Sequence, residues 1–191
     1  MYFETDYACS IFGHRKIEWN KQIEQRTRKL FLFLIKKRGV RFFYFGSNSD
    51  FYVYCYEMLN EIREVNKDIK LIGFPCAFQN MFKIGEKEKI ENNLKLVANK
   101  NIKLMEFDEI YLENERFFGK NAYVLRNQIM VKFSKYSVFY FDNERKGGTE
   151  YIFDFSLKKR NMAFNVLKKS PNGDFRLFGK ARCLSGLAHD N

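Results

Sequence analysis

The stretch Tyr7-Ala8-Cys9-Ser10-Ile11-Phe12-Gly13-His14-Arg15 decides how the chain is expected to fold. Its first six residues form an apolar run, which predicts a buried strand. The polar turn Gly13-His14-Arg15 follows, and an amphipathic pattern over residues 16–38 predicts a long helix directly after it. In α/β proteins, the turn between the first strand and the first helix is a common place for phosphate-bearing ligands.

The rest of the chain repeats this alternation of apolar strands and amphipathic helices. Strands apolar on both faces favour a parallel sheet covered by helices. We therefore predict an α/β fold, a Rossmann-like three-layer sandwich with a mainly parallel central sheet. The further strands are predicted at residues 40–45, 69–74, 136–141 and 162–167, and the further helices over 50–65, with Asp50 as its cap, 122–134 and 147–159.

Two regions break the pattern. Between residues 76 and 100 the alternation is lost, with a helix expected around 86–96, and an extended segment is expected over 102–107. Residues 169–191 carry scattered charges and no clear period. We predict a single domain over residues 1–168 and a C-terminal tail of unassigned role over 169–191.

The composition favours a folded protein with an anionic partner. Of the 191 residues, 46% are hydrophobic, so disorder is not expected and the length suits one domain. The formal net charge of +11 favours nucleotides, nucleic acid or acidic membrane as partners. Lysine and arginine are scattered along the chain, which weakens the case for nucleic acid. A basic protein without a special partner is the alternative.

Several classes of protein are disfavoured by what the sequence lacks. There is no signal-peptide pattern, and the longest apolar run, residues 30–35, is too short to span a bilayer, so we expect a cytoplasmic protein without a membrane partner. Two histidines argue against a zinc site, and we expect no metal and no cofactor. The four cysteines (Cys9, Cys55, Cys76 and Cys183) form no C-x-x-C pair and are interpreted as reduced and mostly structural. Dehydrogenase and nucleoside triphosphatase fingerprints are absent.

Three small-residue turns are expected to meet at one edge of the sheet, because crossovers bring the carboxyl ends of parallel strands together. Glycines and backbone amides suit phosphate, and arginine can form paired hydrogen bonds to it. A carboxylate such as Asp50 can accept from a ribose hydroxyl. The candidate residues are Gly13, His14 and Arg15; Gly46, Ser47 and Asp50; Gly147, Gly148 and Thr149; and Arg126 with Asn127 on the predicted helix 122–134.

Each candidate also has a plainer interpretation. His14 would cap its own turn, and Arg15 would pair with a local acid. Asp50 would only cap its helix. Arg126 lies beside the apolar stripe of its helix and would be a solvated surface residue. The convergence of three turns on one edge favours the binding interpretation over these alternatives.

Four motifs, taken in chain order, resemble the YoqJ/YpsA-like branch of the SLOG superfamily. They are Cys9–Arg15, Phe45-Gly46-Ser47 with Asp50-Phe51, Arg126-Asn127 with Met130-Val131 and Ser134, and Gly147-Gly148-Thr149. The superfamily has Rossmann-like folds and includes the LOG phosphoribohydrolases and the DNA-processing protein DprA. Some of its members, in bacterial anti-phage defence, sense nucleotide messengers made from NAD. The resemblance spans about residues 7–167 and implies a nucleotide-like ligand over the strand ends, lined by the candidates above.

One position departs from the hydrolase pattern. LOG hydrolases carry Gly-Gly-x-Gly-Thr-x-x-Glu, and the position of their acid, three residues after the threonine, is Ile152 here. Glu150 and Asp154 are off that spacing, and Glu150 lies about 200° around a helix from Ile152. The remaining catalytic candidates are Arg126, Glu150 and Asp50.

We therefore expect a protein that binds a nucleotide or an ADP-ribose-type compound, sensing or sequestering it without turnover. One alternative is a nucleoside 5′-monophosphate phosphoribohydrolase of the LOG type, which needs a carboxylate near the anomeric carbon. The other is nucleic-acid binding in the manner of DprA. A homo-oligomer, formed through an exposed aromatic helix face, is a further expectation.

Overall fold

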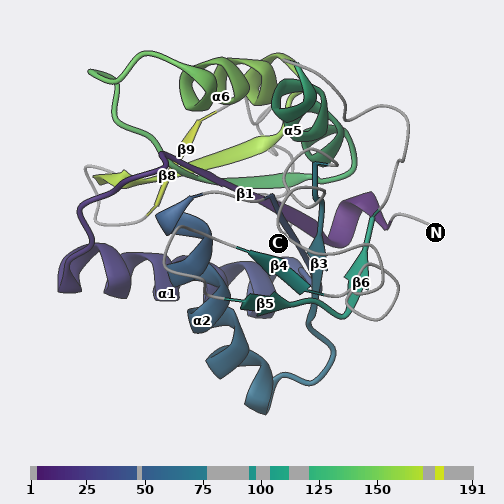
Figure 1. The fold of residues 1–191 in the computed structure, drawn as a ribbon. Helices are drawn as coiled ribbons and strands as arrows, with labels where there is room; N and C mark the ends of the chain where they lie inside the picture. Colours follow the sequence, from purple (N-terminus) through teal and green to yellow (C-terminus); the bar gives the residue numbers. More distant parts are fainter. Residues whose placement is uncertain are drawn as a thin grey trace, which may run out of the picture.

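The structure is a computed structural model that describes residues 4–46, 49–76, 95–97, 104–111, 121–169 and 175–178. Within these ranges the centre is a seven-stranded sheet in the order β6-β3-β2-β1-β7-β8-β9 (Figure 1). The strands from β6 to β8 in that order run parallel, and β9 pairs antiparallel with β8. The predicted α/β fold with a mainly parallel sheet is confirmed. The strands are β1 (Ala8–Gly13), β2 (Phe42–Phe45), β3 (Lys70–Gly73), β6 (Glu109–Ile110), β7 (Tyr136–Tyr140), β8 (Met162–Lys169) and β9 (Phe175–Phe178).

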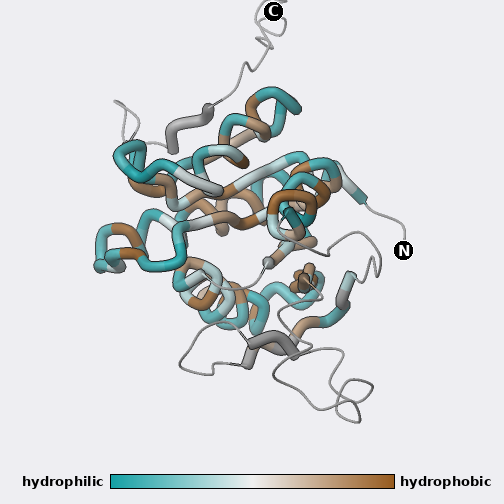
Figure 2. The backbone as a smooth tube through the Cα atoms, turned by 45° about the horizontal axis from the view of Figure 1, so that its top comes forward, coloured by the Kyte–Doolittle hydropathy of each residue, from teal (hydrophilic) through white to brown (hydrophobic). Residues whose placement is uncertain are grey.

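Helices cover both faces of the sheet and make three layers (Figure 1). Successive side chains of a strand point to opposite faces, so β1 contributes Ile11 to one core and Phe12 to the other. Teal and brown segments alternate along the helices in Figure 2, as expected for helices with one buried face. After the short 3₁₀ helix η1 (Thr5–Tyr7), the helices are α1 (Lys21–Arg38) and α2 (Asp50–Val65) on one face, and α5 (Ala122–Lys132) and α6 (Gly148–Lys158) on the other.

Two helix starts differ from the sequence prediction. The first helix begins at Lys21 instead of residue 16, because the Asn20 side chain accepts hydrogen bonds from the N–H groups of Gln22 and Ile23 and caps it there. Residues 14–20 therefore form a strap between β1 and α1. The prediction that the amides after Gly13 belong to the start of this helix is wrong. The cap of α2 is Ser49, whose hydroxyl accepts from Phe51 N–H, and not Asp50.

The irregular regions hold strands that the sequence indicated only in part. Residues 95–97, inside the helix expected around 86–96, form β4 (Lys95–Val97), which pairs antiparallel with β5 (Leu104–Glu106) inside the predicted extended segment. The rest of the expected helix lies outside the described residues. Strand β9 lies in the predicted tail, so the sheet continues past residue 168. Among the described residues, no helix combines the length and hydropathy that a membrane span needs.

Candidate functional site

The strand order places a crevice between β1 and β7. From β1 the chain moves outward to β2 and β3 on one side, and then returns to β7 and β8 on the other side. Open α/β sheets bind ligands outside the carboxyl ends of the strands at this reversal, where the two following loops diverge. The turns after β1 and β7 are two of the three turns that the sequence singled out.

A cavity of about 360 Å³ lies at this point. This volume is within the range of small-molecule sites. It brings together eight of the predicted ligand-binding residues: Gly13, His14, Arg15, Arg126, Asn127, Gly147, Gly148 and Thr149. Its other lining residues, which sequence reasoning missed, are Phe12, Ser49, Tyr52, Tyr123, Lys146 and Ile152. Gly46 and Asp50 are not among the lining residues, and Ser47 lies outside the described residues.

Gly13 and Gly46 are needed for packing, which differs from the role predicted for them. A Cβ atom on Gly13 would lie 2.5 Å from the Phe51 Cβ, so the glycine lets the first turn of α2 rest on the end of β1. A Cβ on Gly46 would lie 2.7 Å from the Arg126 Cζ and 2.9 Å from the Tyr52 hydroxyl oxygen. Gly46 therefore leaves room for the guanidinium of Arg126, which lines the cavity.

Arg126 is buried, with 3% of its surface exposed, and is not a solvated surface residue. Its Nε and Nη2 donate to Asn127 Oδ1 at 3.1 and 3.0 Å, and its Cζ lies 5.4 Å from the centre of the Tyr123 ring. Burial raises the pKa of Cys76, whereas the Arg126 guanidinium and its hydrogen bond to the thiol oppose that rise. A guanidinium at a cavity wall has the charge and the planar set of donors that suit an anionic ligand.

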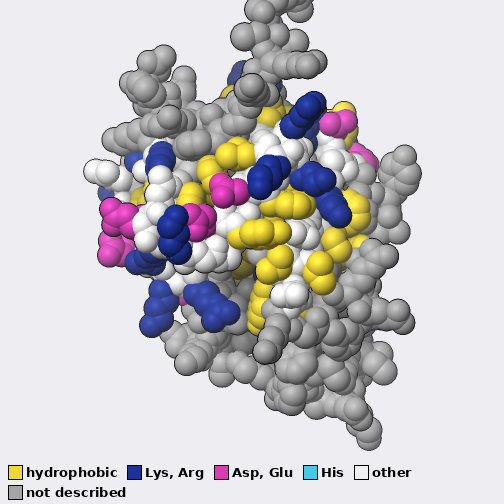
Figure 3. Space-filling model, turned by 90° about the horizontal axis from the view of Figure 1, so that it is seen from above, with side chains coloured by type: hydrophobic (Ala, Val, Ile, Leu, Met, Phe, Trp, Pro, Cys, Tyr) yellow, Lys and Arg dark blue, Asp and Glu magenta, His cyan; other side chains and the backbone are white. Residues whose placement is uncertain are grey.

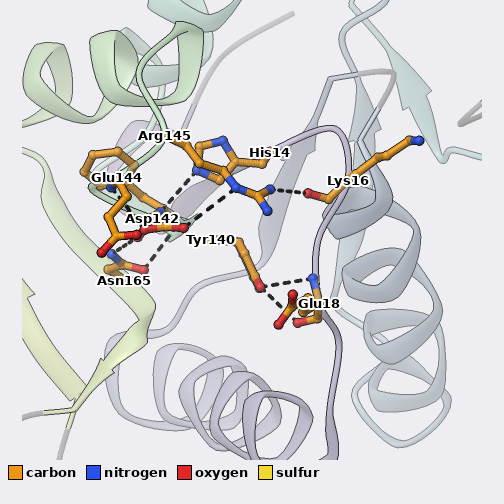
Figure 4. Close-up of polar contacts among 9 residues, drawn as sticks. His14, Lys16, Glu18, Tyr140, Asp142, Glu144, Arg145 and Asn165 are labelled. Carbon is orange, nitrogen blue, oxygen red and sulfur yellow. Dashed lines mark hydrogen bonds and ion pairs between the residues drawn. The ribbon is translucent and has the colours of Figure 1, made fainter.

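His14 joins the turn after β1 to the turn after β7. Its Nε2 accepts a hydrogen bond from the Asp142 N–H at 3.1 Å, so the ring is neutral and its proton is on Nδ1 (Figure 4). Burial lowers the pKa of His14, and the charge of Arg145 lowers it further. The His14 carbonyl accepts from the Ser49 hydroxyl at 2.8 Å. The residue thus holds three segments of the cavity rim in place.

The strap over residues 14–20 is fixed above the end of β7. The Tyr140 hydroxyl donates to the Glu18 carbonyl at 2.9 Å and accepts from the Glu18 N–H at 3.2 Å (Figure 4). Arg145 Nη1 donates to the Lys16 carbonyl at 2.9 Å. The indole of Trp19 stacks on the Tyr54 ring of α2, with the ring centres 4.6 Å apart. These contacts make the cavity rim a preformed structure.

The N-terminus of α6 supplies the third turn. Gly147 has φ +144°, a conformation that glycine tolerates, and it precedes the first residue of the helix. A Cβ built on Gly148 meets no atom within 4 Å, so this backbone faces open space in the cavity. The first backbone amides of a helix have no partners within the helix and favour anions.

The two carboxylates considered as catalytic candidates do not line the cavity. Glu150 pairs with Lys146 at 2.6 Å and also accepts from the Gly147 amide, and both interactions lower the pKa of Glu150. It is thus the partner that caps α6. Asp50 is the first residue of α2, and its N–H donates to the Arg15 carbonyl at 3.0 Å.

The charged groups around the cavity are cations. Arg15, Arg126 and Lys146 line it, and no aspartate or glutamate is found among the described lining residues. Ile152 is buried in the wall of the cavity. Tyr123 could have been found from the sequence, since it lies one helical turn before Arg126. Lys146 directly precedes the predicted turn Gly147-Gly148-Thr149 and could have been found in the same way, whereas Tyr52 becomes a lining residue only through the tertiary fold.

The described histidine, cysteine and acidic residues do not form a metal centre. Within the described ranges, no three His, Cys, Asp or Glu residues are grouped so that they could hold a metal ion. Cys9, Cys55 and Cys76 are buried free thiols, as predicted, and Cys183 lies outside the described residues. No protein-family model and no curated protein sequence matches this chain.

The outer side of α5 and α6 exposes apolar side chains. Leu125 on α5 is 40% exposed and Tyr151 on α6 is 47% exposed. Hydrophobic side chains bordered by Lys and Arg are seen on this side in Figure 3, where the molecule is viewed from above. The homo-oligomer stays a prediction, and this face is an apolar surface available to it.

Proposed function

We propose that this chain is a SLOG-like, cytoplasmic protein that binds a nucleotide or an ADP-ribose-type compound at the β1–β7 crevice and holds it intact. The observation that carries the proposal is the charge of the cavity lining. Three cations and the first turn of α6 surround it, and no carboxylate is found among its described residues. Such a lining suits a phosphorylated ligand.

The rings and the charges divide the cavity into two kinds of surface. Lys146 and the Gly147-Gly148-Thr149 turn offer a cation and backbone amides, which suit a phosphate group. Tyr52 and Tyr123 offer aromatic surface beside the Arg126 guanidinium. A molecule with both phosphate and flat or sugar-like parts, such as a nucleotide, matches this combination better than inorganic phosphate does.

Turnover is the less favoured function for the same site. Hydrolysis of an N-glycosidic bond in the LOG manner needs a carboxylate near the anomeric carbon. Ile152 occupies the corresponding position, and Glu150 is engaged with Lys146 and the Gly147 amide. A binding role, sensing or sequestering, needs none of these groups.

The test is incubation of the protein with a panel of nucleoside monophosphates, NAD, ADP-ribose and cyclic ADP-ribose forms, followed by ultrafiltration and mass spectrometry. We expect one intact compound to be retained with the protein. Free base and ribose phosphate in the filtrate would instead establish a hydrolase.

A matched pair of variants shows whether retention uses this cavity. Lys146→Gln removes a lining cation that is ion-paired with Glu150, and Lys70→Gln removes a cation paired in the same way with Glu109 away from the cavity. Retention should fall only in Lys146→Gln. Equal retention in both variants would remove Lys146 from the site.

A further inference from the structure

We propose that the opposite, amino edge of the sheet carries a second anion site, which binds the phosphodiester backbone of a nucleic acid. A cavity of about 300 Å³ lies there, between the ends of α5 and α6 and the starts of β7 and β8. Of its eight described lining residues, four are cations and none is acidic. The lining residues are Thr5, Val131, Lys132, Ser134, Lys135, Lys159, Arg160 and Asn161.

The topology explains why these cations meet. Helices that connect parallel strands run back against them, so their C-termini lie at the amino edge. Helix α5 ends at Lys132 before β7, and α6 ends next to Lys159 before β8, and these two strands are neighbours. Two basic helix ends are thereby brought side by side.

A buried side chain fixes the two turns relative to each other. Asn161, with 6% of its surface exposed, donates from Nδ2 to the Val131 carbonyl at 3.0 Å and to the Ser134 carbonyl at 2.7 Å. Asn161 belongs to the turn after α6, and both acceptors belong to the end of α5 and the turn after it. The floor of the basic cavity is therefore a rigid structure.

The cationic side chains are not needed as hydrogen-bond donors to the last carbonyls of α6. Backbone N–H groups already satisfy the last carbonyls of α6: Lys159 donates to Phe155, Arg160 to Leu157, and Asn161 to Ser156. Lys135 pairs with Asp6 at 2.9 Å. Among the described residues this is the one ion pair made by the four cations, so the cluster keeps a net positive charge.

Arg160 occupies a position that does not favour an arginine. Its φ is +62°, in the left-handed region that glycine adopts readily and other residues rarely. The backbone turn needs this conformation so that β8 can start beside β7, and glycine would serve it better. An arginine here places a long cation at the rim of the cavity.

Side-chain exposure favours a polyanion over a small ligand. The Lys135 side chain is 46% exposed, and Lys132, Lys159 and Arg160 are also exposed, in contrast to the 3% of Arg126. Exposed, solvated cations bind a phosphate chain mainly because binding releases the counterions condensed on that chain. A single small phosphate compound gains little from them. The net charge of +11 also favours a polyanionic ligand.

The test measures binding of a fluorescein-labelled single strand of about 20 nucleotides by fluorescence anisotropy over a range of salt concentrations. The variant Lys132→Gln/Lys159→Gln/Arg160→Gln removes three cluster cations. Its matched control, Lys36→Gln/Lys37→Gln/Arg38→Gln, removes three exposed cations from the last turn of α1 and lowers the net charge equally.

We expect the cluster variant to lose affinity on the order of tenfold at low salt, with a salt slope shallower by about 2, since each phosphate contact on a single strand contributes about 0.7. The control should stay within about twofold of the wild type. No binding by the wild type, or an equal loss in both triple variants, would overturn the proposal. Tighter binding to phosphatidylserine vesicles than to the oligonucleotide would also overturn it.

Arg160→Gly separates a binding defect from a folding defect. Glycine suits φ +62°, so the melting temperature should hold or rise while oligonucleotide affinity falls. A variant that binds as well as the wild type would remove Arg160 from the site. Retention of the small nucleotide by the cluster variant should be unchanged, so the two proposed sites can fail independently.

Discussion

The two edges of the sheet both carry cations, but they bury them differently. At the carboxyl edge Arg126 is 3% exposed and is held by Asn127 and Tyr123, in a cavity lined in part by aromatic rings. At the amino edge the cations lie on exposed side chains around a rigid floor. A buried, oriented cation recognises one particular ligand, whereas exposed cations attract any phosphate chain. The burial of the cations therefore distinguishes a site for one small ligand from a site for a phosphate chain, which the net charge alone does not.

The largest expected effect comes from Arg126→Met, which removes the buried cation. We expect affinity for the retained nucleotide to fall by about 3 kcal/mol or more, because a desolvated charge-assisted hydrogen bond is lost. Arg126→Lys, which keeps the charge without the planar fork, should lie between this variant and the wild type. Calorimetry measures the affinity, and oligonucleotide binding at the amino edge should not change. If folded Arg126→Met lost nucleotide binding and oligonucleotide binding equally, the assignment of the two ligands to different edges of the sheet would be wrong.

The next effect concerns the glycines under the carboxyl-edge cavity. Gly13→Ala places a Cβ 2.5 Å from the Phe51 Cβ, close to the backbone of α2, and should destabilise the fold by about 1–3 kcal/mol. Gly148→Ala, where a Cβ meets no atom within 4 Å, is the control and should leave stability near that of the wild type. Chemical denaturation of both variants checks this. A larger loss for Gly148→Ala would contradict the packing role of Gly13.

A smaller effect is the pH dependence that His14 gives to the carboxyl edge. Burial and Arg145 lower its pKa in the folded state below the ordinary value of 6.5, so the unfolded chain takes up the proton first. Stability is therefore full above pH 6.5 and is lost as the pH falls from 6.5 through the folded-state pKa. His14→Asn keeps an acceptor for the Asp142 N–H without this titration. Melting temperatures at pH 7.5 and 5.5 should differ less in the variant than in the wild type.

The smallest effect is expected from Glu150→Gln. The carboxylate does not line the cavity, but it pairs with Lys146 and accepts from the Gly147 amide, so its loss should lower the melting temperature slightly. Retention of the nucleotide should stay close to that of the wild type. If the wild type released free base and Glu150→Gln did not, Glu150 would be the acid of a hydrolase.

The sequence predicts the layers well because short apolar runs rich in aromatic residues, such as Tyr136–Tyr140, favour strands buried on both faces. It misplaces the start of α1, since Ile17 and Trp19 continue an apolar pattern that the Asn20 cap and the Tyr54 ring interrupt. Most of the proposed binding residues do meet in one cavity, because strand ends meet at one edge. The burial of Arg126 could not be predicted, since it depends on tertiary neighbours.

Hydrogen–deuterium exchange with and without the retained nucleotide tests the central claim most directly. Peptides that cover residues 13–20 and 146–150 should gain protection, because the turn after β1, its strap and the first turn of α6 surround the carboxyl-edge cavity. Peptides that cover residues 132–135 and 159–161 should not change. Protection of the amino-edge peptides instead, or of neither set, would contradict the assignment of the small ligand to the β1–β7 crevice.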